Sequence, residues 1–197
     1  MSCLPSGTER RPYEAIPGRA ERSPRGDSAG DNLLQIWLRP LAVDEAMALL
    51  AGTGAPAAGL RWHEEYPMTE TMAGLGLVLG AHQESGGTLK GTPSWWLQQI
   101  VLGDLVVGDV GFHGPPPVTG PPEVEIGYDV VESLRGRGIA TRACQLILEQ
   151  AWRDGAEVVY AETEPGNAAS QAVLRHAGFV VHGDRYAHRR PSGSARR

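Results

Sequence analysis

Apolar residues follow strand-like or helix-like spacing from about residue 32 to residue 183. Short runs rich in β-branched and aromatic residues, bounded by Gly, Pro or Asp, predict strands at 33–38, 94–102, 105–113, 124–131, 158–162 and 179–182. Apolar residues that return every three or four positions predict helices from Asp44, the expected cap, to Gly52 and at 141–154. Helices are also predicted at 68–83, against the effect of three glycines, and at 167–176, ended by Gly178. This order predicts one α/β domain with a mixed sheet.

Two local signals refine the predicted sheet. Gly103-Asp104 separates two predicted strands by two residues, which is the spacing of a β-hairpin. The run 124–131 places apolar side chains at its even positions. The opposite face of this strand holds Glu123, Glu125, Gly127 and Asp129. The strand therefore has one face for a core and one face available for chemistry.

The two ends of the chain lack apolar periodicity. Residues 1–31 are rich in Pro, Gly, Ser, Arg and Glu, and we expect a disordered extension there. The last nine residues, 189–197, read RRPSGSARR and predict an Arg-rich flexible tail. The folded domain is therefore expected at 32–188. A chain of 197 residues and 21.1 kDa with 41% hydrophobic residues suffices for one such core.

Several classes of protein are disfavoured by composition. No apolar run approaches the roughly 20 residues of a membrane span, and the amino terminus lacks the apolar centre of a signal peptide. We therefore expect a cytoplasmic protein with no membrane partner. Two cysteines, Cys3 and Cys144, can build neither a disulfide framework nor a four-ligand zinc site, and no metal is expected. Cys144 lies on the apolar side of a predicted helix, as a small core residue would.

The net charge of −5 is unevenly distributed. Residues 1–31 are neutral, residues 32–166 carry −10 and residues 167–197 carry +5. An acidic body disfavours nucleic acid, so no nucleic-acid partner is expected, and it favours cationic substrates. The same acidity also keeps a protein soluble, so charge alone does not define a ligand.

The segment from Arg135 to Ala140, RGRGIA, joins a predicted strand directly to a predicted helix. Free backbone N–H groups and the positive end of the helix meet at such a turn, which favours phosphate. Gly136 and Gly138 allow close approach of an anion, and Arg137 adds charge. The segment is neither a Walker loop nor a dinucleotide fingerprint, and by itself it also fits a glycine-rich turn with solvated arginines.

The stretch EVEIGYDVVESLRGRGIATRACQLILEQAW resembles the acyl-CoA-binding motif of the GNAT superfamily of N-acetyltransferases. That motif reads Gln/Arg-x-x-Gly-x-Gly/Ala, and its three places are filled by Arg135, Gly138 and Ala140.

A later stretch, ETEPGNAASQAVLRHAGFVVHG, resembles the second motif of the same family, in which an Asn opens a helix that ends in Gly-Phe. Asn167, Gly178 and Phe179 match it. Two motifs in the right order are more specific than one, and the resemblance covers about residues 32–183, with its closest likeness to the ribosomal-protein and protein N-terminal branch.

The resemblance implies a mostly antiparallel central sheet with helices on both faces. The strands 124–131 and 158–162 would splay apart to admit the pantetheine arm of acetyl-CoA, the only co-substrate implied. Main-chain groups of the first strand would pair with that arm, the turn would hold the pyrophosphate, and an Asn would contact the arm or the sulfur region. The implied cofactor-binding residues are Tyr128, Asp129, Val130, Val131, Arg135, Gly136, Arg137, Gly138, Ile139, Ala140, Thr141 and Asn167.

Amine acetylation needs a base for the amine and benefits from an acid for the departing thiolate. By family position Glu125 is the expected base, directly or through water, although a solvated or salt-bridged strand residue would look the same. A backbone N–H near Val130 would polarise the thioester. Many relatives carry a Tyr seven residues after the motif Asn, where this chain has Leu174. Ser170 is therefore the expected acid, or a helix residue satisfied by its own backbone, with Tyr160 and Tyr186 in reserve.

The acceptor stays open at this stage. The opening strand and helices and Ser170 most resemble the branch that acetylates protein N-termini. Alternatives are a small amine, such as an aminoglycoside, polyamine or amino-acid derivative, and a non-catalytic acyl-CoA sensor. Family position puts residues 62–66 at the acceptor wall, whereas His113 is expected at the surface or hydrogen-bonded, and Trp95 and Trp96 on opposite faces of a strand. Homodimers are common in the family.

Overall fold

The computed structural model describes residues 35–84 and 95–192. The predicted amino-terminal extension and the end of the predicted carboxyl tail lie outside the described residues. Among the described residues, no helix is long and apolar enough to cross a membrane.

The centre of the molecule is a mixed sheet with the strand order β1-β3-β4-β5-β6-β8-β7, and β2 lies beside β4. The strands are β1 Ile36–Pro40, β2 Arg61–Trp62, β3 Leu97–Leu102, β4 Leu105–Phe112, β5 Glu123–Val130, β6 Val158–Ala161, β7 Val180–His182 and β8 Arg185–Arg189. All neighbours are antiparallel except β5 with β6 and β2 with β4. The predicted hairpin at Gly103-Asp104 joins β3 to β4.

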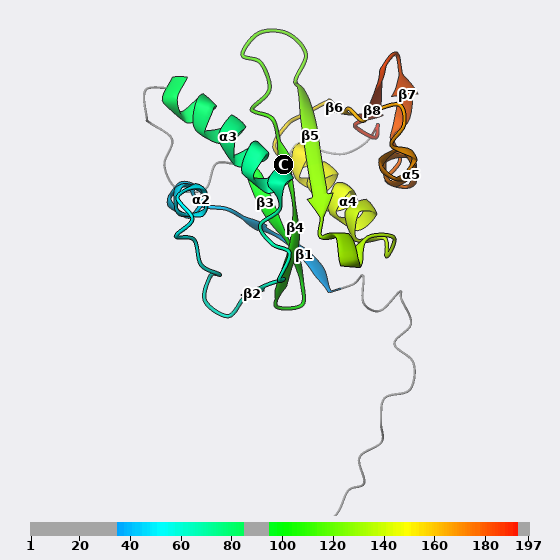
Figure 1. The fold of residues 1–197 in the computed structure, drawn as a ribbon. Coiled ribbons are helices and arrows are strands. Elements are labelled where there is room, and N and C mark those ends of the chain that lie inside the picture. Colours follow the sequence, from blue (N-terminus) through cyan, green and yellow to red (C-terminus); the bar gives the residue numbers. More distant parts are fainter. Residues whose placement is uncertain (1–34, 85–94, 193–197) are drawn as a thin grey trace, which may run out of the picture.

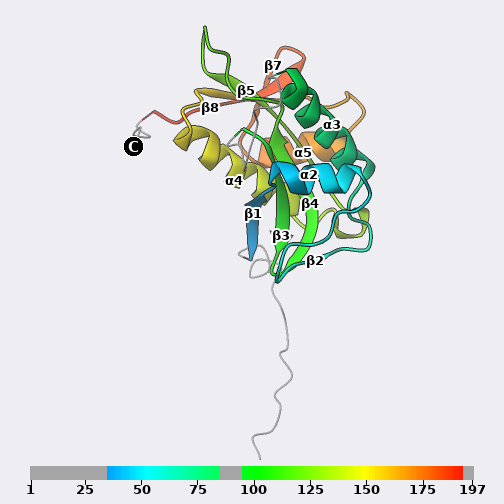
Figure 2. The same cartoon turned by 90° about the vertical axis from the view of Figure 1, so that its left-hand side faces the viewer.

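Helices cover both faces of the sheet. They are α2 Val43–Leu50, α3 Thr69–Glu84, α4 Ile139–Arg153 and α5 Ala168–His176, with a short 3₁₀ turn, η1, at Glu132–Leu134. Helices α2 and α3 lie on one side of β3, β4 and β5, and α4 and α5 lie on the other side (Figures 1 and 2). The predicted fold class is therefore confirmed.

Two apolar clusters hold these layers together. Helix α4 turns a face that includes Ala143, Ile147 and Ala151, all fully buried, toward the sheet, where β4 is buried along nearly its whole length. On the other side, Leu75 of α3 packs with Leu49 of α2 in a smaller cluster. The sheet thus lies between two helix layers, one on each side of β5.

The structure corrects several boundaries. Helix α2 begins after Ala42, whose N–H donates to Glu45 Oε2 at 2.9 Å, so the prediction of Asp44 as the cap was wrong. Asp44 lies in the first helical turn, where a carboxylate still favours the helix. Trp95 and Trp96 precede β3 rather than alternating within it, and Trp96 is buried against α2 and α3.

Two strands were not predicted. β2 has only two residues, and β8 (RYAHR) has an apolar signal too weak to separate from a loop. β8 runs one residue past position 188, and the Arg190 N–H donates to the Glu157 carbonyl at 2.9 Å. The ordered sheet therefore includes the start of the predicted tail.

Candidate active site

A gap opens between β5 and β6. The two strands pair only at Glu123–Val158, Val124–Val159 and Glu125–Tyr160, after which β5 continues to Val130 beside β4 alone. The register with β4 makes Val131 and Val107 a hydrogen-bonded pair, so the N–H and C=O groups of Val130 point away from β4, into the gap. This is the splayed arrangement expected from the sequence.

The glycine-rich turn stands where the gap ends. Gly136 and Gly138 adopt φ of 75° and 79°, the left-handed region that glycine reaches without strain. The first hydrogen bond of α4 runs from the Arg142 N–H to the Gly138 carbonyl at 3.0 Å, so the N–H groups of residues 139–141 precede the helical ladder. Backbone donors, the positive end of the helix dipole and the exposed Arg137 therefore meet at this turn, an arrangement that favours an anion.

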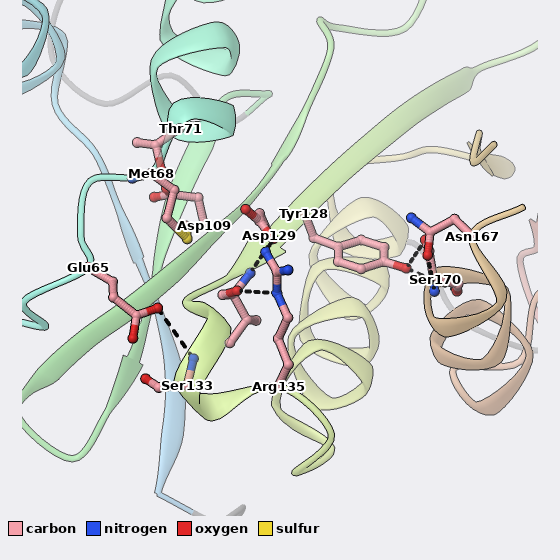
Figure 3. A network of polar contacts seen from close by, with 11 residues as sticks. Glu65, Met68, Thr71, Asp109, Tyr128, Asp129, Ser133, Arg135, Asn167 and Ser170 are labelled. Carbon is pink, nitrogen blue, oxygen red and sulfur yellow. Dashed lines mark hydrogen bonds and ion pairs between the residues drawn. The ribbon is translucent and has the colours of Figure 1, made fainter.

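Arg135 does not extend toward this turn. Its Nε donates to the Val130 carbonyl at 2.9 Å and its Nη2 to Asp129 Oδ1 at 3.0 Å, so the side chain folds back over β5 (Figure 3). Asp129 Oδ1 also accepts from the Val130 N–H at 2.9 Å. Both gap-facing backbone groups of Val130 are thus occupied by side chains.

Tyr128 and Ser170 form a second link across the gap. The Tyr128 hydroxyl lies 2.7 Å from Ser170 Oγ and 3.2 Å from the Ser170 carbonyl, bridging β5 to α5 (Figure 3). Asn167 caps α5 by accepting from the Ser170 N–H at 2.9 Å, a role that Asn favours. Burial raises the pKa of Tyr128 above its usual range, so the phenol keeps its proton.

A cavity of about 280 Å³ lies on the other side of β5, between α3 and the strands β4 and β5. Cross-strand pairs from β4 and β5 line it: Asp109 stands opposite Asp129, and Gly111 opposite Gly127. α3 supplies Glu70 and Leu77. Of the described residues that line the cavity, three are carboxylates and none is Lys or Arg, so the cavity is negatively charged.

The two aspartates differ in their surroundings. Asp109 is 3% exposed and accepts from the Tyr66 hydroxyl at 3.0 Å and from the Thr71 hydroxyl. Burial raises the pKa of Asp109 to about 7, against the opposing effect of these hydrogen bonds. The pKa of Asp129 is also raised, chiefly by burial, and its Oδ2 is buried without a hydrogen-bond partner among the described residues.

His113 and Glu125 extend the same face of the sheet. Their backbones are paired, with the His113 N–H 2.9 Å from the Glu125 carbonyl, and His113 Nδ1 lies 3.2 Å from Glu125 Oε1. A proton on Nδ1 would face this carboxylate and would leave Nε2 as the acceptor nitrogen of the ring. A Cβ on Gly127 would come within 3.0 Å of that Nε2, so the imidazole lies over glycine backbone in the cavity lining, with Glu125 behind it.

Sequence reasoning underrated His113, which is hydrogen-bonded but also lines the cavity. The signal was its register: with a hairpin-like return, position 113 falls opposite 125 on the polar face. Segment 62–66 behaves otherwise, because none of its residues lines the cavity. The Tyr66 hydroxyl donates to Asp109, and Glu65 Oε2 accepts from the Ser133 N–H at 3.3 Å. Hydrogen bonding to Ser133, chiefly to its side chain, lowers the pKa of Glu65.

The remaining candidate residues do not line the cavity. Leu174, at the place of the relatives' Tyr, is fully buried. Cys144 is a buried core residue, and burial raises the pKa of its thiol to about 12. Tyr186 and Tyr160 stack with Arg side chains on the β6–β8 side. Within residues 35–84 and 95–192, no group of three or more His, Cys, Asp or Glu is placed to hold a metal ion.

Three features together are typical of an acyl-CoA-dependent acyltransferase fold: the splayed sheet, the glycine-rich turn before α4, and the Asn167 cap of α5. The family model for the acetyltransferase (GNAT) domain matches residues 35–180, most of the chain, and the protein belongs to this family.

Individual relatives are more distant. The L-methionine sulfoximine/L-methionine sulfone acetyltransferases of Pseudomonas aeruginosa and Pseudomonas paraeruginosa are 34% identical over 87 residues, 42% of this chain and 46% of theirs. The chain thus matches about half the length of these curated relatives.

Solved structures share the fold. RimJ from Mycobacterium smegmatis in complex with a CoA disulfide has 23% identity and a TM-score of 0.52, covering 78% of this chain and 81% of its own. AAC(6')-Ib in complex with paromomycin and acetyl-CoA has 15% identity and a TM-score of 0.54, covering 79% and 94%. At these identities the likeness concerns the fold alone.

Proposed function

We propose that the protein transfers the acetyl group of acetyl-CoA to the primary amine of a small cationic acceptor. The observation that carries this proposal is the position of β5 between two sites of opposite charge. One edge of β5 opens on a gap that leads to an anion-binding turn, and one face of it floors a cavity lined by carboxylates. A strand shared in this way brings an anionic acyl donor and a cationic amine together.

The residues beside the gap fit the donor. Backbone N–H groups of residues 139–141 and Arg137 would hold the pyrophosphate, and the N–H and C=O groups of Tyr128 and Val130 would pair with the pantetheine amides. Asn167 stands at the far side of the gap. The thioester of the bound donor supplies an acetyl group activated for attack by an amine. A backbone N–H of β5 would polarise its carbonyl.

Glu125 and His113 are proposed to take the proton from the acceptor ammonium. The Glu125 carboxylate lies 3.2 Å from Nδ1 and would orient the imidazole, and His113 lines the cavity, where an amine would stand and Nε2 would accept its proton. A carboxylate also stabilises the imidazolium that forms when Nε2 takes a proton. Glu125 thus acts as the base through His113 rather than by direct contact.

Ser170 is proposed to protonate the departing thiolate. Its hydroxyl stands at the first turn of α5 and is hydrogen-bonded to the Tyr128 phenol, which can return a proton to it. The phenol therefore takes the place of the family Tyr at the position occupied here by buried Leu174. The pair would deliver one proton to the sulfur through two hydroxyl groups.

The cavity favours a small amine over a protein N-terminus as the acceptor. A volume of about 280 Å³ under α3 suits a small molecule, and its charge comes only from acids among the described lining residues. An acceptor that carries its own carboxylate would meet repulsion there. We therefore favour polyamines and amino sugars over free amino acids such as methionine sulfone.

Isothermal titration calorimetry tests the proposal first. The full chain should bind acetyl-CoA with micromolar affinity, and replacing Gly138 by Trp should abolish binding by strain and by blocking the turn. The Arg137→Gln variant, which leaves the backbone intact, should weaken binding, and circular dichroism should show both variants folded. No binding by the wild-type protein would contradict the proposal.

Turnover then separates an enzyme from a sensor. Release of coenzyme A, followed with a thiol reagent across diamines, amino sugars, amino acids and short peptides, should be greatest for amines without a carboxylate. A protein that binds acetyl-CoA tightly but turns over none of these amines or peptides would be an acyl-CoA sensor. Preference for peptides would restore the protein N-terminal acceptor.

A further inference from the structure

Asp129 belongs to both proposed substrate sites at once. Its carboxylate lines the acidic cavity, and the same Oδ1 accepts from Arg135, the first residue of the anion turn, at 3.0 Å. Asp129 Oδ2 is buried without a partner among the described residues. A half-buried carboxylate in this position depends on Arg135 and on the Val130 N–H for its compensation.

Binding of the donor would remove that compensation. The Val130 carbonyl is held by Arg135 and the Val130 N–H by Asp129, so both contacts must break before the pantetheine arm can pair with β5. A phosphate on the turn would also attract Arg135, because Arg135 directly follows η1 and is the first residue of the turn. Asp129 would then face the cavity with its negative charge unpaired.

We propose that Asp129 is a positioning residue that holds Arg135 back in the free protein and is released into the acceptor cavity when the donor binds. The inference rests on the proposed function. An ammonium in the cavity replaces Arg135 as the partner of Asp129, so each substrate raises the affinity of the site for the other. The acceptor cavity therefore reaches its full negative charge only in the presence of the donor.

Cross-strand Asp109 does not share this role. It accepts its hydrogen bonds from Tyr66 and Thr71, on the side of α3, whereas in the described part of the chain the Arg135 guanidinium pairs with Asp129. This difference makes Asp129, and not Asp109, the residue that couples the donor site to the acceptor cavity. Asp129 alone is placed to exchange a protein cation for a substrate cation.

Calorimetry with coenzyme A, which cannot react, tests the first half of the proposal. Asp129→Asn keeps the shape but weakens the hold on Arg135, so coenzyme A should bind about three- to fivefold more tightly. In an Arg135→Gln background the same Asp129→Asn change should have no effect. Glu132→Gln is the matched control, because it removes a nearby exposed charge without touching the Arg135 side chain.

Three results would overturn this half: unchanged or weaker binding by Asp129→Asn, equal tightening in the Arg135→Gln background, or equal tightening by Glu132→Gln. Equal tightening by Glu132→Gln would show that the loss of any nearby negative charge strengthens coenzyme A binding. Thermal denaturation of each variant should show a folded protein. Failure of the wild-type chain to bind coenzyme A would instead overturn the proposed function itself, so the two failures are distinguishable.

The second half is tested with 1,4-diaminobutane as the cationic probe. Saturating coenzyme A should raise the affinity of the wild-type protein for the diamine about tenfold, and Asp129→Asn should abolish the increase. Equal affinity with and without coenzyme A, or no binding in either state, would overturn the release of Asp129 into the cavity.

Discussion

Asp109 and Asp129 stand directly opposite each other on β4 and β5, and both residues line the cavity under α3. Like charges in such a cross-strand pair oppose each other. The two aspartates have different partners, which reduces this repulsion. Asp109 is buried and accepts hydrogen bonds from two hydroxyl groups, and Asp129 is paired with Arg135. The pair therefore holds less than its full charge near neutral pH.

The buried carboxyl of Asp109 predicts a pH dependence of stability. Its pKa is about 7 in the folded protein and about 4 in an unfolded chain, so the native state keeps the proton between these values. Stability from this group is complete below about pH 4 and is lost as the pH rises through 7. Asp109→Asn mimics the protonated carboxyl and removes that dependence.

Urea denaturation between pH 5 and 8 measures the effect. The unfolding free energy of the wild-type protein should fall by roughly 3 kcal/mol relative to that of Asp109→Asn across this range. Asp104→Asn, which removes an exposed aspartate paired with Arg61, serves as the control and should follow the wild-type profile. Parallel profiles for wild type and Asp109→Asn would contradict the assignment.

The His113–Glu125 pair predicts a separation of binding from turnover. Glu125→Gln should lower kcat by about 10² to 10⁴ while coenzyme A affinity stays unchanged, because the side chain lies on the cavity face and not in the gap. His113→Gln should lower kcat similarly. Glu123→Gln changes the neighbouring carboxylate on the same strand face and leaves the His113–Glu125 contact in place, so it is the control. Full activity of Glu125→Gln would remove Glu125 from the mechanism.

The hydroxyl pair across the gap predicts unequal effects of two substitutions. Ser170→Ala should lower kcat by about 10²-fold, because the thiolate loses its immediate proton donor. Tyr128→Phe should cost less, because Ser170 can take its proton from water. Both are measured by initial rates with saturating acetyl-CoA. A larger loss in Tyr128→Phe would make the phenol the direct donor.

Glycine at position 108 predicts a stability effect with a close internal control. A Cβ there would lie 2.2 Å from the Asp129 carbonyl, so Gly108→Ala must move backbone of β5 and should cost about 2–3 kcal/mol. Gly76 lies exposed in α3 with nothing within 4 Å, so Gly76→Ala should stabilise by about 0.5–1 kcal/mol. Denaturant titration compares the two, and equal stabilities would contradict the packing at β4.

Much of this architecture was predictable from sequence because its signals are local. The hairpin at Gly103-Asp104 and the helix cap at Asn167 depend on residues close in the chain, and the structure has both where the pattern indicated, whereas Asp44 was wrong as the cap of α2. The two family motifs then predict which strands are neighbours in the sheet. Helix α3 was predicted in spite of three glycines, which lower the helix propensity of this segment.

Side-chain partnerships in the site were not predictable in the same way. Nothing in the run of residues indicates that Arg135 folds back onto Val130, since the contact depends on the path of η1. The Tyr128–Ser170 contact joins positions 42 apart and depends on the placement of α5 across the gap. The pairing of His113 with Glu125 required the exact register between β4 and β5.

Because β5 and β6 pair over a short ladder at one end, a small rotation between these two strands becomes a larger displacement at their far ends. Three residue pairs are the only ones recorded between these strands in the described part of the chain, and they lie at one end of β5. From Glu125 to Val130 the strand extends about 17 Å beyond that seam. A pivot of about 5° there displaces the far end by roughly 1.5 Å, half the reach of a hydrogen bond. Small angular adjustments at the seam can therefore set the width of the gap along its whole length.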